Sequence, residues 1–238
     1  MTRIAIMRYT SQQRGERMEE QNVSNWRSYI VTLVLLVLNI IGYILCTQMG
    51  EVVYTIGSMN AEKIFVEHEY YRFLTSIFLH ADIEHIVSNM IFLVGLGQMV
   101  EQTVGHISFV ILYLLSGFGG SIFSILYAVL TGNIYDAVGA SGAIFGLVGA
   151  LFVLVLARDL RRRSYRQVTM DILDQDGREI PSAYESISVG KLIFAVVYMI
   201  YSGSRAVGID NAAHVGGLLC GILIMAMINL VNTGGYKG

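Results

Sequence analysis

The stretch AVGASGAIFGLVGALFVLVLA, residues 137–157, contains no Asp, Glu, Lys or Arg. A helix of this length rises about 30 Å, which matches the hydrocarbon core of a bilayer. The composition of the whole chain agrees, since 54% of its 238 residues are hydrophobic and 14% are charged. The sequence therefore predicts an integral membrane protein and not an ordinary soluble domain.

Five further runs without charged residues have the same character, and we expect an all-α polytopic membrane protein with six transmembrane helices. The six runs are residues 30–46, 86–100, 107–130, 137–157, 192–204 and 211–232. The second and fifth runs are short, so their spans must include flanking polar residues that reach the interface. A polar stretch of mixed charge precedes the first run, which favours a retained anchor over a cleaved signal peptide.

The polar segments predict how the chain is divided. The expected boundaries are residues 1–28 for a polar N-terminal segment, 29–232 for the six-helix membrane domain and 233–238 for a short tail. Within the domain we expect an outer loop over residues 47–84 and an inner loop over residues 158–190. Alternating polar and apolar residues on either side of Asp176-Gly177 predict a small hairpin in the inner loop.

Lys and Arg residues are distributed unevenly between the two ends of the expected spans. If the N-terminus is cytoplasmic, 13 of the 16 basic residues lie inside, and only Lys63, Arg72 and Arg205 lie outside. The positive-inside rule then predicts that both termini are cytoplasmic. The formal net charge of −2 indicates no basic field for a nucleic acid partner, and the expected surroundings are the lipid bilayer.

Three polar clusters lie at the span ends that this topology places on the outer face. His85 and Asn89 share one face of the second span because they are four residues apart. Ser141 lies at the start of the fourth span in a glycine-rich sequence, and His214 lies at the start of the sixth. Polar side chains in a membrane are costly unless they pair or function, so all four are candidate site residues.

These residue types suit acyl transfer. A serine at a helix N-terminus lies beside unsatisfied backbone N–H groups and the positive end of the helix dipole, and both stabilise a developing oxyanion. His214 can take the proton of the Ser141 hydroxyl from about 3 Å away. His85 and Asn89 can then donate hydrogen bonds to the oxyanion. Each residue by itself has a simpler explanation in helix packing, and only the combination favours catalysis.

Five motifs, from about residue 67 to residue 230, resemble the rhomboid family of intramembrane serine proteases. In chain order they are Glu69-Tyr70-Tyr71-Arg72 with Thr75 and His80, His85-x-x-x-Asn89, Gly97 with Glu101 and Gly105, Gly139-Ala140-Ser141-Gly142-Ala143-Ile144-Phe145-Gly146, and Ala213-His214-Val215-Gly216-Gly217. Tyr71 stands where an aromatic residue, often tryptophan, is usual. One such motif is weak evidence, but five in this order indicate the family.

The resemblance implies a rhomboid-like six-helix bundle with a Ser–His dyad and without a third catalytic carboxylate, a metal or a cofactor. Ser141 would attack a peptide carbonyl, and His214 would act first as base and then as acid. His85, Asn89 and the backbone N–H of Ser141 would hold the oxyanion. The implied partners are single-span membrane proteins, cut near the outer face where helix-breaking residues open the chain.

The same resemblance implies supporting roles for further residues. Asn211 would support the loop of the base, and Gly139 belongs to the nucleophile motif. Phe145, four residues after Ser141, would stack under His214. The residues expected to be structural are Glu69, Arg72, Gly97, Glu101 and Gly217.

Two other classes of function stay open at this point. A non-catalytic rhomboid-like binder of transmembrane segments would be marked by loss of the serine or the histidine, and both are present. A transporter or channel would need a polar route through the bilayer or inverted repeats, and the sequence shows neither. Asp136 and Asp210, which flank the candidate site, are interpreted as solvated loop residues.

Overall fold

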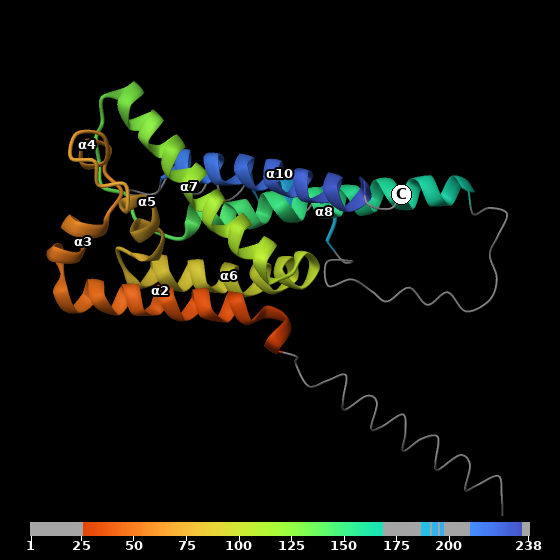
Figure 1. Ribbon diagram of the computed structural model, residues 1–238, viewed down its shortest axis with the longest axis horizontal. Coiled ribbons are helices and arrows are strands. Elements are labelled where there is room, and N and C mark those ends of the chain that lie inside the picture. Colours follow the sequence, from red (N-terminus) through yellow and green to blue (C-terminus); the bar gives the residue numbers. More distant parts are fainter. Residues whose placement is uncertain (1–25, 169–186, 191, 195, 198–209, 235–238) are drawn as a thin grey trace, which may run out of the picture.

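The structure, a computed structural model, describes residues 26–168, 187–190, 192–194, 196–197 and 210–234 (Figure 1). Its helices are η1 (Trp26–Tyr29), α2 (Ile30–Met49), α3 (Glu51–Gly57), α4 (Ala61–Phe65), α5 (Arg72–Thr75), η2 (Ser76–Phe78), α6 (Ile83–Val104), α7 (His106–Thr131), α8 (Ser141–Val168) and α10 (Asn211–Gly234). Among the described residues, five helices are long and apolar enough to cross a membrane: Trp26–Met49, Ile83–Val104, His106–Thr131, Ser141–Leu160 and Asn211–Leu230. The chain is therefore an all-helical, multi-pass membrane protein.

Five of the six expected spans coincide with these helices. The expected fifth span, residues 192–204, lies mainly outside the described residues. Within and beside that run, residues 189–190, 192–194 and 196–197 are helical. The hairpin predicted around Asp176-Gly177 also lies outside the described residues.

Helix α8 does not end with its uncharged run at residue 157, where the expected inner loop starts. The helix continues through the basic residues that start at Arg158 and ends at Val168. Arginine is a good helix former, so the loss of hydropathy does not end the helix. In addition, Arg158 Nη2 donates a hydrogen bond to the carbonyl oxygen of Ile187 at 2.8 Å. The end of an apolar run thus marks the expected membrane boundary and not the helix terminus.

Helices α7, α8 and α10 form the packed centre of the bundle, and α2 and α6 lie together along its side (Figure 1). Side chains from each of the three central helices are fully buried, including Leu112 and Tyr113 of α7, Leu147 of α8 and Met225 of α10. The short helices α3, α4 and α5 gather at one end of the bundle, where α8 and α10 begin (Figure 1). We call this the active-site end, after the candidate site residues Ser141 and His214 in the first turns of α8 and α10.

Glu101 of α6 joins the start of α2 to the start of α7. Its fully buried carboxylate accepts hydrogen bonds from the backbone N–H of Val31 at 2.9 Å, and from the N–H and hydroxyl of Thr32 at 2.7 and 2.6 Å. Nδ1 of His106 lies 2.6 Å from the same carboxylate. A Cβ on Gly97, one turn earlier, would lie 2.8 Å from the Thr32 side chain, so glycine permits the close approach. The carboxylate thus accepts hydrogen bonds from backbone N–H groups in the first turn of α2. These groups have no carbonyl acceptor within their own helix.

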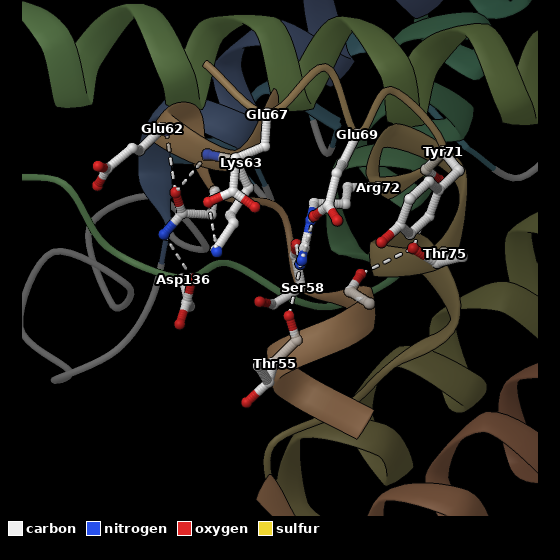
Figure 2. A network of polar contacts seen from close by, with 12 residues as sticks. Thr55, Ser58, Glu62, Lys63, Glu67, Glu69, Tyr71, Arg72, Thr75 and Asp136 are labelled. Carbon is white, nitrogen blue, oxygen red and sulfur yellow. Dashed lines mark hydrogen bonds and ion pairs between the residues drawn. The ribbon is translucent and has the colours of Figure 1, made fainter. Parts of the chain in front are cut away.

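Arg72 organises residues 47–84, the expected outer loop, for which we keep that name (Figure 2). Its side chain is buried, with Nε donating to Glu69 Oε2 at 2.7 Å, Nη1 to the carbonyl of Ser58 at 2.9 Å and Nη2 to that of Thr55 at 2.7 Å. These bonds tie α5 to the end of α3. The hydrogen bond and charge of Arg72 hold the pKa of the Glu69 carboxyl below its usual value.

Replacing Glu101 with alanine should destabilise the protein strongly. The change leaves two backbone N–H groups and one hydroxyl without acceptors in a buried place, which costs roughly 3–5 kcal/mol. Thermal unfolding of the purified protein in detergent micelles measures the effect. The matched control is Glu84→Ala on the same helix, whose exposed side chain should change stability by less than about 1 kcal/mol. Equal shifts in unfolding temperature for the two variants would contradict the role of Glu101 in holding the start of α2.

Replacing Glu69 with glutamine should remove a pH-dependent part of the stability. Because the folded state lowers the pKa of Glu69, the stabilisation is fully present above the usual carboxyl pKa of 4.5 and is lost as the pH falls through the lower folded value. Wild type should therefore unfold at a higher temperature than Glu69→Gln at pH 7, and the gap should shrink below about pH 4.5. A gap that is unchanged between pH 7 and pH 3 would exclude the ion pair as its cause.

Candidate active site

Ser141 is the first residue of α8, and the segment before it is held by the outer loop. Met59 and Ala137 form an antiparallel bridge, with N–H···O distances of 2.9 Å in both directions. The N–H of Gly139 donates to the carbonyl of Ser76 at 2.9 Å. These backbone bonds fix the turn into α8, so Ser141 lies at a helix N-terminus whose first-turn N–H groups have no helical acceptor.

Asp136, an exposed loop residue as expected, contributes to the same attachment. Asn60 Nδ2 donates to Asp136 Oδ1 at 2.8 Å (Figure 2). The side-chain oxygen of Asn60 also caps α4, accepting from the N–H groups of Glu62 and Lys63 at 2.9 and 3.1 Å. One asparagine therefore links the outer loop to the segment that precedes the candidate nucleophile.

Gly139 brings this segment against α6. Its φ of +130° lies in the region that favours glycine. A Cβ at this position would lie 2.7 Å from Cε1 and Nε2 of His85 and 3.7 Å from Nδ2 of Asn89. Both side chains thus lie beside the backbone two residues before Ser141. Nδ2 of Asn89 is buried without a hydrogen-bond partner among the described residues, so this donor is available to a ligand oxygen.

His80 packs against His85 on the side of the outer loop. The two rings meet edge to face with centroids 5.1 Å apart. Burial, with a smaller effect of the neighbouring His85, lowers the pKa of His80 to about 4. The His80 ring is therefore neutral at pH 7 and adds no charge beside the candidate oxyanion donor.

His214 lies in the first turn of α10 and stacks flat on Phe145 of α8. The ring centroids are 4.2 Å apart and the planes differ by 10°. Phe145 follows Ser141 by one helical turn on the same face of α8, so the stack brings the imidazole to the face that carries the hydroxyl. The ring is buried, and its Nδ1 has no hydrogen-bond partner in the described part of the chain. Stacking on Phe145 therefore orients this imidazole.

Glycines allow α8 and α10 to approach at backbone distance. A Cβ on Gly217 would overlap the carbonyl oxygen of Gly142, and one on Gly221 would overlap that of Gly146. The two helices lie side by side from their first turns (Figure 1). Because Gly142 follows Ser141 and Gly217 follows His214 within one turn, this contact controls the separation of the two candidate catalytic residues.

A small cavity, lined by both polar and apolar residues, opens beside Ser141. Its volume is about 30 Å³, which is room for one or two water molecules. Ser76, Ser124 and Asp210 are among the residues that line it. Asn211, the first residue of α10, has a buried side-chain oxygen without a partner among the described residues. Within the same residues, no group of three or more His, Cys, Asp and Glu side chains is arranged to hold a metal ion.

Sequence reasoning missed one feature of this region. Asp210 accepts a hydrogen bond from the N–H of Ala213 at 2.9 Å and caps α10, and is therefore not a simple solvated residue. An aspartate directly before an apolar helical run is a helix-start signal that was available in the sequence. Its hydrogen bond to Ser124, by contrast, joins residues 86 positions apart and has no local signal.

The fold and the site define a multi-pass helical membrane protein with a serine, two histidines and an asparagine at one end of the bundle. Comparison with protein families matches residues 67–230 to the Rhomboid domain. The match covers more than half of the chain, which therefore belongs to the rhomboid family.

Individual relatives agree with this assignment. The chain is 27% identical to rhomboid protease GluP of Bacillus subtilis over 246 aligned residues, which cover 99% of this chain and 42% of the relative. It is 32% identical to RHOMBOID-like protein 1 of Arabidopsis thaliana over 168 residues, or 71% of this chain and 37% of the relative. It is also 32% identical to mitochondrial RHOMBOID-like protein 6 of the same plant over 186 residues. These residues cover 76% of this chain and 51% of the relative. The chain thus spans 37% to 51% of the length of these relatives.

Replacing Gly217 with alanine should destabilise the bundle, because the added methyl group overlaps the Gly142 carbonyl and pushes α10 from α8. Overpacking of this kind costs roughly 1–3 kcal/mol. Gly95→Ala is the matched control, since a Cβ on this glycine of α6 would meet no described residue within 4 Å. Alanine there should leave stability equal or raise it by about 0.5–1 kcal/mol. Thermal unfolding in detergent compares the two, and a Gly217→Ala protein as stable as Gly95→Ala would refute the close contact.

Proposed function

We propose that this chain is an intramembrane serine endopeptidase that cuts single-span membrane proteins through an acyl-enzyme. The observation that carries the proposal is the convergence of three helix starts: Ser141 on α8, His214 on α10, and the pair His85 and Asn89 on α6. The relationship to a named rhomboid protease gives it further support.

In the proposed reaction, Ser141 Oγ bonds to the carbonyl carbon of the scissile peptide while His214 takes the hydroxyl proton. Because Nδ1 of His214 is buried, Nε2 is the nitrogen that we assign to this transfer. His214 then gives the proton to the leaving nitrogen as the C–N bond breaks. Water, activated by the same imidazole, attacks the acyl-enzyme and releases the second product.

The negative charge of each tetrahedral intermediate lies on the former carbonyl oxygen. We assign its stabilisation to the side chains of His85 and Asn89 and to the backbone N–H of Ser141. Nδ2 of Asn89, which has no hydrogen-bond partner among the described residues, lies beside the segment before Ser141 and supports this role. Donors of this kind are worth about 3 kcal/mol each in transition-state stabilisation.

The membrane context belongs to the same proposal. We infer a six-helix bundle in which the run at residues 192–204 supplies the remaining span, with both termini cytoplasmic and the active-site end toward the outer face. A helical substrate has no accessible peptide carbonyl, because its backbone is hydrogen-bonded. Substrates with helix-breaking residues near the outer surface are therefore expected to be preferred.

The dyad is tested by cleavage of a single-span model substrate in liposomes, resolved on gels, with the products identified by mass. Ser141→Ala and His214→Ala should each lower the cleavage rate by roughly 1,000-fold or more, because either change removes the nucleophile or its base. Matched controls are Ser108→Ala, at the far end of α7, and His68→Asn in the outer loop. Asparagine tolerates the positive φ of 60° at residue 68. Both controls should cleave as wild type does.

A serine-directed fluorophosphonate probe separates the enzyme from the non-catalytic binder. Labelling of wild type that disappears in both dyad variants, together with unchanged folding, supports the protease even where the model substrate is poor. A folded wild-type protein that is neither labelled nor able to cut would overturn the proposed function and favour a binder of transmembrane segments.

A further inference from the structure

A hydrogen-bonded cluster at the active-site end joins three segments that are far apart in the sequence. Ser124 of α7 donates its hydroxyl proton to Oδ2 of Asp210, directly before α10. The hydroxyl of Tyr135, in the segment that leads to α8, lies 3.3 Å from the same Ser124 oxygen. We call these three residues the outer clamp.

The hydrogen bond from Ser124 to Asp210 sets the direction of the neighbouring bond, and the Tyr135 hydroxyl also interacts with Asp210 itself. Ser124 donates its proton to the Asp210 carboxyl oxygen, which leaves the serine oxygen to accept from Tyr135. Burial is the main cause that raises the pKa of Tyr135, which keeps its hydroxyl protonated as a donor. Ser124 itself is fully buried, so its oxygen cannot exchange these partners for bulk water.

Asp210 connects the outer clamp to the first turn of α10 through hydrogen bonds. Its Oδ1 accepts from the N–H of Ala213 at 2.9 Å, and its backbone carbonyl accepts from the N–H of His214 at 3.2 Å. The carboxylate therefore fixes the first turn of the helix that holds the imidazole. Among the described residues no hydrogen bond holds the ring at Nδ1, and its place depends on this turn and on the stack with Phe145.

Tyr135 connects the outer clamp to the segment that precedes Ser141. It lies six residues before Ser141, in the segment that also pairs with the outer loop through Ala137. The same buried hydroxyl of Ser124 thus contacts both the segment before the serine and the residue that caps the helix of the histidine. The cavity beside Ser141 is lined by Ser124 and Asp210 as well, which places the outer clamp directly next to the site.

We propose that Ser124, together with Asp210 and Tyr135, is a positioning cluster that holds Ser141 and His214 at the separation that proton transfer requires. The inference rests on the proposed protease function and adds positioning residues to it. None of the three is assigned a bond-making role. Their loss acts on catalysis through the geometry of the dyad.

Ser124→Ala removes both bonds at the centre of the outer clamp, and Tyr135→Phe removes one. A misplacement of about 1 Å at a reacting pair costs up to about 100-fold in rate, so we expect Ser124→Ala to lower kcat by roughly 10-fold to 100-fold with little change in KM. The double variant Ser124→Ala with Tyr135→Phe should be no slower than Ser124→Ala, because both changes break the same unit.

Asp210 offers a graded test. Asp210→Asn keeps an oxygen for the Ala213 N–H and places an amide donor opposite the Ser124 oxygen, so it should retain much of the activity. Asp210→Ala loses both contacts and should be at least as slow as Ser124→Ala. The controls are Thr131→Ala and Tyr127→Phe, which remove hydroxyls from exposed positions at the same end of α7 and should leave the rate unchanged.

The deciding measurement is the rate constant and the final extent of Ser141 labelling by the fluorophosphonate probe, with kcat and KM for a cleaved substrate alongside. A positioning role predicts a lower rate constant at full extent, and the same fold-change in kcat. A merely structural role would lower the extent, through loss of folded protein, and leave the rate constant of the remaining molecules unchanged.

The possible failures are distinguishable. If wild type labels and cleaves, and Ser124→Ala and Tyr135→Phe have the same rate constant as wild type, the positioning role of the outer clamp is overturned. The proposed protease function then stands. If Ser124→Ala and Tyr135→Phe slow the reaction additively, a shared unit is overturned. If wild type is folded but neither labels nor cleaves, the proposed function fails and the positioning role fails with it.

Discussion

The backbone contact between α8 and α10 is the constraint on which the site depends. Lipid tails are as apolar as helix side chains, so helices in a bilayer gain little from hydrophobic burial against each other and rely on close packing. Here glycines remove the side chains between Gly142 and Gly217, and between Gly146 and Gly221. Ser141 and His214 then come within one turn of the contact, which makes their separation a property of the packing.

Buried polar groups hold the helices around this contact. Glu101 binds the start of α2, Arg72 ties α5 to α3, and Asp210 joins the start of α10 to Ser124 of α7. Each charged group has several hydrogen-bond partners, which is the condition under which a charge is tolerated in a low dielectric. Two of the three lie at the active-site end, where the outer loop also holds the segment before Ser141.

Much of the fold could be predicted because hydropathy is a local property of the chain. Five uncharged runs correspond to helices of the structure, and the order of motifs placed His85, Asn89, Ser141 and His214 at span ends. The continuation of α8 beyond residue 157 was missed, because helix propensity persists where hydropathy is lost. Asp210 was misinterpreted although its position before an apolar run is an N-cap signal.

The sequence by itself determined that this is a polytopic membrane protein and which residue types are available for chemistry at the span ends. The tertiary structure decided that Gly139 lies against His85, that Phe145 stacks on His214, and that Ser124 meets both Asp210 and Tyr135. The reason is physical. A span is set by some twenty neighbouring residues, whereas contacts between residues far apart depend on the angles and distances at which whole helices pack.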